Sequence, residues 1–232
     1  MNLPKAYSAN KPTCRRPTRQ TFQRINMPTL LLIRHGDNDY LKKGRLAGQL
    51  PGIHLNETGH EQAAELARTL AGVPLKALYS SPLERAVETA EPLAMALRLE
   101  VQLRPDLTDT DVGAWAGRSW KALRRTKVWK VIQQTPSRFQ FPGGETFVQT
   151  QNRVIAALEA IAAAHTARDL IAVIFHADPI KLAVAHYIGL PLDHFQSLMV
   201  DTGSVSVLII GESGARLAAL NLKPPFTFPH QK

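Results

Sequence analysis

The chain lacks several features that whole classes of protein require. Its only cysteine, Cys14, has no partner for an internal disulfide and no second thiol for a cysteine-based zinc site. No apolar run is long enough to span a bilayer, and the first one, at Leu30, lies too far along the chain for a secretory signal. These absences fit a reducing compartment, so we expect a cytoplasmic protein without a membrane partner.

Acidic residues are also absent from the first 26 residues, which contain six of the chain's 28 lysines and arginines. The net charge of +9 therefore belongs mostly to this leader, and we expect no nucleic-acid partner for the body that follows. Its prolines and scarce apolar residues predict disorder. The leader could be a start-site artefact ahead of Met27, which we favour, a nucleic-acid-binding arm or a transit peptide. We assign it no function.

The body has an ordinary composition for one globular domain. The 232 residues are 44% hydrophobic and 20% charged, which is enough to bury a sizeable core. We expect a leader over residues 1–27, a folded domain over 28–223 and a short tail over 224–232. Specificity for a ligand would reside in the irregular region 106–143.

Strand-like and helix-like segments alternate through the body, which predicts an α/β fold. The expected strands are 30–33, 77–79, 99–103, 170–175, 205–210 and 217–222, and a hairpin is expected between the last two. The expected helices include 145–165 and 179–188. Asn56 marks one further helix start. Ser81 to Glu84 reads as a capping box with proline at the first helical position, and Pro92 is expected to kink or restart that helix.

Reactive side chains follow three of these strands. Arg34 and His35 follow the first apolar run, His176 follows the run 170–175, and Arg85 lies in the first turn of the helix after the second strand. An isolated Arg-His-Gly could equally be a solvated strand end. If the strands are parallel, however, the four side chains meet at one sheet edge, where ligands bind. Guanidinium groups beside a helix N-terminus match phosphate oxygens.

Six short motifs carry a resemblance to a known family. They are Leu32–Gly36, Leu55–Gly59 with Gln62-Ala63, Ser80–Ala86 with Thr89-Ala90, Gly113–Gly117, Phe141–Glu145, and His176. In this order, over residues 29–222, the chain resembles the histidine phosphatase superfamily, also called the phosphoglycerate mutase-like fold. It is most similar to a bacterial branch of phosphomutases and broad-specificity phosphatases. The resemblance implies a three-layer α/β/α sandwich around a mostly parallel sheet.

The resemblance also implies a role for each of these residues. His35 would attack phosphorus as a neutral imidazole, and water would then hydrolyse the phosphohistidine. Arg34 and Arg85 would hold the phosphoryl oxygens, and His176 would donate a further hydrogen bond. Because this arginine pair supplies the positive charge, neither a metal nor a cofactor is required.

The chain departs from the family pattern at two positions. Many members carry glutamate where Asp109 stands, and we expect Asp109 to be the proton donor, with Asp111 and Asp178 as alternatives. Many members also carry a phosphate-contacting asparagine where Leu41 stands, and Asn38 would replace it from a shifted position.

Other conspicuous residues have simpler explanations. Glu145 could line the pocket, although its place near a helix start explains it adequately. The basic side chains between 121 and 130 are expected to form a solvated helix face, with recognition of a polyanionic substrate as the alternative; they are Lys121, Arg124, Arg125, Lys127 and Lys130. Core or lid packing is the expected role of Trp115, Trp120 and Trp129. No chemical task is assigned to five further histidines, which are His54, His60, His165, His186 and His194.

The predicted function is hydrolysis of small phosphomonoesters, without a metal, through a phosphohistidine. A phosphoglycerate mutase or other phosphomutase is the first alternative, disfavoured by the lack of a long insertion that would close over a bisphosphorylated intermediate. An inactive phosphate-binding scaffold is the second, because Asp109 and Leu41 depart from the pattern. The expected partner is a small phosphorylated metabolite, and the oligomeric state stays open.

Overall fold

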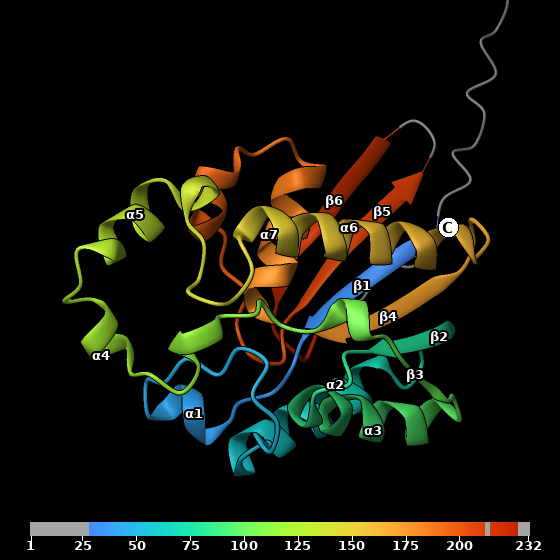
Figure 1. Cartoon of the computed structure of the whole chain (residues 1–232). Coiled ribbons are helices and arrows are strands. Elements are labelled where there is room, and N and C mark those ends of the chain that lie inside the picture. The colour runs from blue at the N-terminus through green and yellow to red at the C-terminus, as the bar shows by residue number, and fades with distance from the viewer. Residues whose placement is uncertain (1–27, 212–213, 227–232) are drawn as a thin grey trace, which may run out of the picture.

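A computed structural model describes residues 28–211 and 214–226 (Figure 1). The expected leader, 1–27, lies outside the described residues, as do 227–232 of the expected tail and two residues of the expected hairpin turn. None of the helices in the described ranges has the length and apolar character needed to cross a membrane.

The core of the fold is one six-stranded sheet with strand order β3-β2-β4-β1-β5-β6. The strands are β1 (Thr29–Arg34), β2 (Leu75–Ser80), β3 (Val101–Leu103), β4 (Leu170–Phe175), β5 (Val205–Gly211) and β6 (Gly214–Leu222). The first four are parallel to one another, whereas β5 runs antiparallel to β1 and β6 antiparallel to β5. The mostly parallel sheet is therefore confirmed, and β5 and β6 pair as a hairpin.

Helices cover both faces of this sheet. They are α1 (Asp39–Lys42), α2 (Glu57–Leu70), α3 (Glu84–Leu97), α4 (Trp120–Leu123), α5 (Val128–Gln134), α6 (Phe147–Ala163) and α7 (Ala177–Tyr187), with short 3-10 turns η1 (Pro105–Leu107), η2 (Gly113–Trp115), η3 (Pro136–Arg138) and η4 (Leu192–Ser197). In Figure 1, α2 and α3 lie together on one side of the sheet, and α6 and α7 on the other. The three-layer prediction is confirmed.

The side chains of β1 show why both faces are covered. Successive residues of a strand point to opposite faces. Leu30 and Leu32 pack into the core beneath α6 and α7, whereas Leu31 and Ile33 pack into the core against α2 and α3. All four side chains are fully buried. An uninterrupted apolar run is typical of a parallel strand that is covered on both faces, so the expected buried strand at 30–33 is confirmed.

An aromatic cluster joins the irregular region to the helical layer. Trp115, Phe139, Phe141, Phe147 and Phe195 are all buried, and their rings meet at tilted or edge-on angles. This cluster anchors the segment that carries α4 and α5, which extends away from the sheet in Figure 1. The expected packing role of Trp115 is confirmed.

Two local predictions around α3 are wrong. The helix begins at Glu84 after Leu83, which makes no side-chain capping bond, so the expected capping box does not form. Ser81 instead follows directly after β2 at the sheet edge, and its hydroxyl lies 2.8 Å from Nε2 of His176. The helix also continues through Pro92 as a single element, so the expected restart there does not occur. At α2 the expected cap is confirmed, since the Asn56 side chain accepts a hydrogen bond from the Gly59 N–H.

The chain leaving β1 passes very close to the start of α2. A Cβ added at Gly59 would lie 2.1 Å from the carbonyl oxygen of Asp37, and one at Gly36 would lie 2.7 Å from the carbonyl oxygen of Gly59. The Asn56 N–H also donates to the Asp37 carbonyl. Glycine at 59 is therefore required by this contact between main chains.

We predict that Gly59→Ala lowers the free energy of unfolding by about 1–3 kcal/mol, because the added methyl group forces the two segments apart. Gly72→Ala is the matched control, since a Cβ there meets nothing within 4 Å. Urea denaturation measures both. Equal unfolding free energies for the two variants would contradict the prediction.

Candidate active site

Three strand ends bring the predicted residues together at one edge of the sheet. In the β1–β4 pairing Arg34 stands opposite Phe175, so the next residues, His35 and His176, are neighbours. Their ring centroids lie 5.2 Å apart, and the main-chain N–H of His35 donates a hydrogen bond to the Phe175 carbonyl. Arg85 enters from the first turn of α3 and is fully buried, as is His176.

A cavity of about 390 Å³ opens at this edge. Five of the six predicted site residues line it, together with one of the alternative proton donors: Arg34, His35, Asn38, Arg85, Asp109 and Asp178. His176 is not among the lining residues, and neither is Asp111. The sequence-based grouping is therefore realised in space, with His176 behind the wall of the cavity.

The hydrogen bonding of His35 leaves one ring nitrogen as a nucleophile. Its Nδ1 lies 2.7 Å from the Gly36 carbonyl oxygen. A carbonyl can only accept, so Nδ1 carries the proton and Nε2 carries the lone pair of the neutral ring. Burial, reinforced by the positive charges of Arg85 and Arg34, holds the pKa of His35 well below its usual value. The ring therefore stays neutral at physiological pH.

Thr89, which sequence reasoning did not assign to the site, fixes the turn at Gly36. Its hydroxyl oxygen accepts a hydrogen bond from the Gly36 main-chain N–H.

The two guanidinium groups retain donors for an anion. Nη2 of Arg85 donates to the Gly48 carbonyl at 2.7 Å, and Nη1 of Arg34 donates to the Val200 carbonyl at 2.8 Å. Within the described ranges, Nε and Nη1 of Arg85 and Nε of Arg34 are buried without a hydrogen-bond partner. Unpaired buried donors on a cation are unfavourable, and tetrahedral oxyanions satisfy such donors well. The arrangement therefore suits a phosphoryl group.

The ring of His176 is held by Ser81, which the sequence pattern had placed in a helix cap. Its Nε2 lies 2.8 Å from the Ser81 hydroxyl, while Nδ1 has no hydrogen-bond partner in the described structure. Burial, together with the charge of Arg85, holds the pKa of His176 well below its usual value. The position of Ser81 directly after a buried strand is the signal that could have identified it.

Asp109 is a carboxyl group with the properties of a general acid. Its Oδ2 lies 3.4 Å from Nη2 of Arg85 and 3.8 Å from Nδ1 of His176. Burial raises the pKa of Asp109 to about 6, although the positive charge of Arg85 opposes that shift. A group half protonated near pH 6 can give up and regain a proton at working pH.

The two alternative carboxylates have different surroundings. Asp111 accepts a hydrogen bond from the Gly113 N–H at 2.9 Å, so its carboxylate serves the turn that follows. Asp178 lines the cavity, but it is 39% exposed and lies 3.8 Å from the amine of Lys181. Of the three carboxyl groups, Asp109 alone both lines the cavity and lies within 4 Å of Arg85 and His176.

Asn38 combines a capping role with a free amide. Its side-chain oxygen accepts from the Leu41 N–H and caps α1. Its Nδ2 is buried and has no partner in the described part of the chain. Asn38 therefore directs a spare donor into the region that also holds Leu41, where the family pattern places an asparagine.

The outer half of the cavity combines aromatic and cationic side chains. Trp120 and Trp129 line it and meet edge-on, and the guanidinium of Arg124 lies over the Trp129 ring. Arg45 and Lys181 add positive charge to the wall. Arg124 was expected on a solvated helix face, but it also contributes to the cavity. Across the described ranges, no group of three or more histidine, cysteine or carboxylate side chains is arranged to hold a metal ion.

Comparison with known proteins agrees with this geometry. Residues 30–223 match the model of the family described as histidine phosphatase superfamily (branch 1). The chain is 30% identical, over 84% of its length and 93% of the relative, to phosphoserine phosphatase 1 of Hydrogenobacter thermophilus. It is 31% identical, over 78% of its length and 87% of the relative, to a 2,3-bisphosphoglycerate-dependent phosphoglycerate mutase of Thermoplasma acidophilum. It also superimposes on the alpha-ribazole phosphatase of Shigella flexneri with a TM-score of 0.75 and 28% identity, covering 87% of this chain and all of the other.

We predict that Arg85→Lys weakens the binding of inorganic phosphate by about 10- to 100-fold, because lysine cannot replace the planar fork and hydrogen bonds to charged groups contribute about 1.5–3 kcal/mol. Isothermal titration calorimetry measures the affinity. Arg68→Lys is the control, since Arg68 pairs with Glu65 on the exposed side of α2. An unchanged affinity in the folded Arg85→Lys variant would contradict the prediction.

Proposed function

Because this chain belongs to the histidine phosphatase superfamily, we propose that it is a phosphatase that hydrolyses small phosphomonoesters through a phosphohistidine at His35. It is an enzyme, and its relatives are phosphatases and mutases. The observation that carries the proposal is the buried, neutral imidazole of His35, which is locked in one tautomer beside two guanidinium groups.

The first half of the reaction transfers the phosphoryl group to the enzyme. Nε2 of His35 forms a bond to phosphorus as the bond between phosphorus and the ester oxygen breaks. Arg34 and Arg85 hold the other phosphoryl oxygens, and their charge balances the transition state. Asp109 gives its proton to the departing alkoxide, which leaves as an alcohol.

The second half restores the enzyme. Water attacks the phosphorus of phosphohistidine through a loose transition state, the proton that this water loses passes to the phosphate that forms, and Asp109 regains its proton from solvent. Inorganic phosphate forms, the bond to Nε2 breaks, and His35 returns to its neutral state. His176 supports this cycle as a hydrogen-bond donor through Nδ1, the ring nitrogen that has no partner in the described residues, while the Ser81 hydroxyl holds the ring through Nε2.

The cavity supports a small phosphorylated metabolite as substrate. Its volume of about 390 Å³ is typical of small-molecule sites. The leaving group would lie against Leu41 and the tryptophan pair Trp120 and Trp129, with Arg124 and Arg45 near any acidic substituent. The expected cytoplasmic location stays a prediction from the sequence.

A phosphomutase is the second candidate. It is favoured by the 31% identity to the phosphoglycerate mutase of Thermoplasma acidophilum. The chemistry up to the phosphohistidine is shared, and the two activities differ in whether water or a second phosphate ester accepts the group. The position of Asp109 near Arg85 and His176 counts against the remaining alternative, an inactive phosphate-binding scaffold.

Turnover with ³²P-labelled phosphate esters, quenched in alkali where phosphohistidine survives, tests the proposal. We expect label on His35 that passes to water, no label in His35→Ala, and normal labelling in His60→Ala, which changes an exposed histidine of α2. Label returned to a second phosphate ester, such as a glycerate phosphate, would establish the mutase instead. Absence of label in a protein that still binds inorganic phosphate would refute both enzymatic functions.

The role of Asp109 predicts a dependence on pH and on the leaving group. The raised pKa of about 6 leaves the acid protonated below that pH, so turnover of an alkyl phosphate should fall as pH rises through 6. Asp109→Asn should slow alkyl phosphates by about 10²- to 10⁴-fold and remove this limb, with little loss on 4-nitrophenyl phosphate.

Steady-state kinetics across pH measures these effects, with Asp111→Asn and Asp178→Asn as matched controls. Equal losses on the two substrates for Asp109→Asn would contradict its assignment as proton donor. A larger and leaving-group-dependent loss for Asp178→Asn would transfer that role to Asp178.

A further inference from the structure

We propose that Arg153 and Glu145 are positioning residues that hold the segment 106–111 in place, so that the carboxyl group of Asp109 reaches the leaving oxygen. The proposal rests on the proposed function, because it takes Asp109 as the proton donor. The segment needs such support. Residues 108–112 lie between η1 and η2 and belong to no helix or strand, so no regular hydrogen-bond ladder fixes Asp109.

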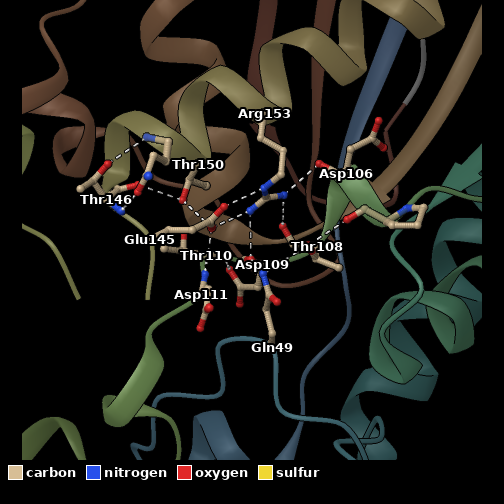
Figure 2. A network of polar contacts seen from close by, with 12 residues as sticks. Gln49, Asp106, Thr108, Asp109, Thr110, Asp111, Glu145, Thr146, Thr150 and Arg153 are labelled. Atoms are coloured by element: carbon tan, nitrogen blue, oxygen red, sulfur yellow. Dashed lines mark hydrogen bonds and ion pairs between the residues drawn. The ribbon is translucent and has the colours of Figure 1, made fainter. Parts of the chain in front are cut away.

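Arg153 projects from α6 and uses its whole guanidinium to hold this segment (Figure 2). Nη1 donates to the carbonyl oxygens of Asp106 and Thr108 at 2.9 and 3.0 Å, and Nη2 donates to that of Asp109 at 3.2 Å. Nε and Nη2 also donate to the two carboxylate oxygens of Glu145, at 2.9 and 2.8 Å. A guanidinium has five N–H donors, so all of them are engaged. A side chain of another shape cannot reproduce this set.

Glu145 completes the clamp at the Asp111 end of the segment. Its Oε2 accepts from the Asp111 N–H and from the Thr150 hydroxyl, both at 3.0 Å. Its own N–H donates to the Asp111 carbonyl. Although burial opposes it, hydrogen bonding to Arg153 and to the Asp111 N–H holds the pKa of Glu145 below its usual value. Glu145 therefore stays ionised and neutralises Arg153. A Cβ added at the preceding Gly144 would lie 2.3 Å from the Asp111 carbonyl oxygen, which shows how closely these segments pack.

The clamp acts on the one residue of the segment whose carboxyl lines the cavity. Asp106 and Asp111 do not line it, whereas Asp109 does. The Asp109 carbonyl is held between Arg153 and the amide of Gln49, which donates to it at 2.8 Å. An aspartate side chain is short, so the position of its carboxyl follows the position of its main chain. A displacement of about 1 Å in a catalytic group can reduce the rate about 100-fold.

A positioning role and a purely structural role predict different kinetics. Loss of folded protein lowers the turnover of every substrate by the same factor. Misplacement of the proton donor slows only those substrates whose leaving group needs the proton. Esters with poor and good leaving groups, compared on the same folded variant, therefore separate the two roles.

The experiment measures kcat for an alkyl phosphate and for 4-nitrophenyl phosphate in Arg153→Lys, which keeps the charge but lacks the fork. We expect a loss of about 100-fold on the alkyl phosphate and little loss on the aryl phosphate. Arg104→Lys is the matched control, because Arg104 pairs with the Asp106 side chain of the same segment without contacting Asp109. It should leave both rates near those of the parent protein.

A double-mutant comparison sharpens the result. In the Asp109→Asn background, Arg153→Lys should cost little further activity, because the group that it positions has already lost its function. Equal losses of the single variant on both esters, or losses that multiply in the double variant, would overturn the proposal. If Arg153→Lys does not fold, as judged by thermal melting, Glu145→Gln keeps the shape of the clamp and is judged by the same criteria.

The outcome for the parent protein separates the two levels of the argument. If it forms no phosphohistidine and turns over neither ester, the proposed function fails, and this inference fails with it. If it forms phosphohistidine while Arg153→Lys and Glu145→Gln show no dependence on the leaving group, the positioning role alone is refuted.

Discussion

The parallel pairing of β1 with β4 is the constraint on which the rest of the structure depends. Because Arg34 stands opposite Phe175, both strands end at the same level, and His35 and His176 meet at one edge. A shift of one residue in this register would turn the apolar side chains of β1 to the wrong faces of the sheet. The two core clusters therefore fix the register, and the register fixes the distance between the imidazoles.

Burial at this edge shifts the pKa values of three groups that lie close together. It lowers the pKa values of His35 and His176 and raises the pKa of Asp109 to about 6. It also leaves guanidinium donors of Arg34 and Arg85 without a hydrogen-bond partner in the described residues. An oxyanion would accept hydrogen bonds from these donors. One physical cause thus keeps His35 neutral, raises the pKa of Asp109 and leaves guanidinium donors available to an anion.

The parts of the site that could be predicted are those that follow regular elements. An apolar run that ends in a polar side chain reveals a strand end, and Arg34, His35 and His176 were found in this way. Arg85 was found from the helix start that follows β2. Ser81 was misassigned because a serine ahead of Pro-Leu-Glu is typical of a helix cap. Its actual partner, His176, follows β4 and comes close only when β4 pairs with β2. Arg153 was missed because it lies 44 residues from Asp109, within an otherwise ordinary helix.

The amino-acid sequence alone gives the alternation of strands and helices, the burial of the strand that became β1 and the reactive residues at the ends of these elements. These follow from periodicity and from neighbours along the chain, which act over a few residues. Only the tertiary structure decided the tautomer of His35, the pKa of Asp109 and the clamp formed by Arg153 and Glu145. Each of these depends on burial or on hydrogen bonds that the folded chain makes. Patterns over a few neighbouring residues do not predict such contacts.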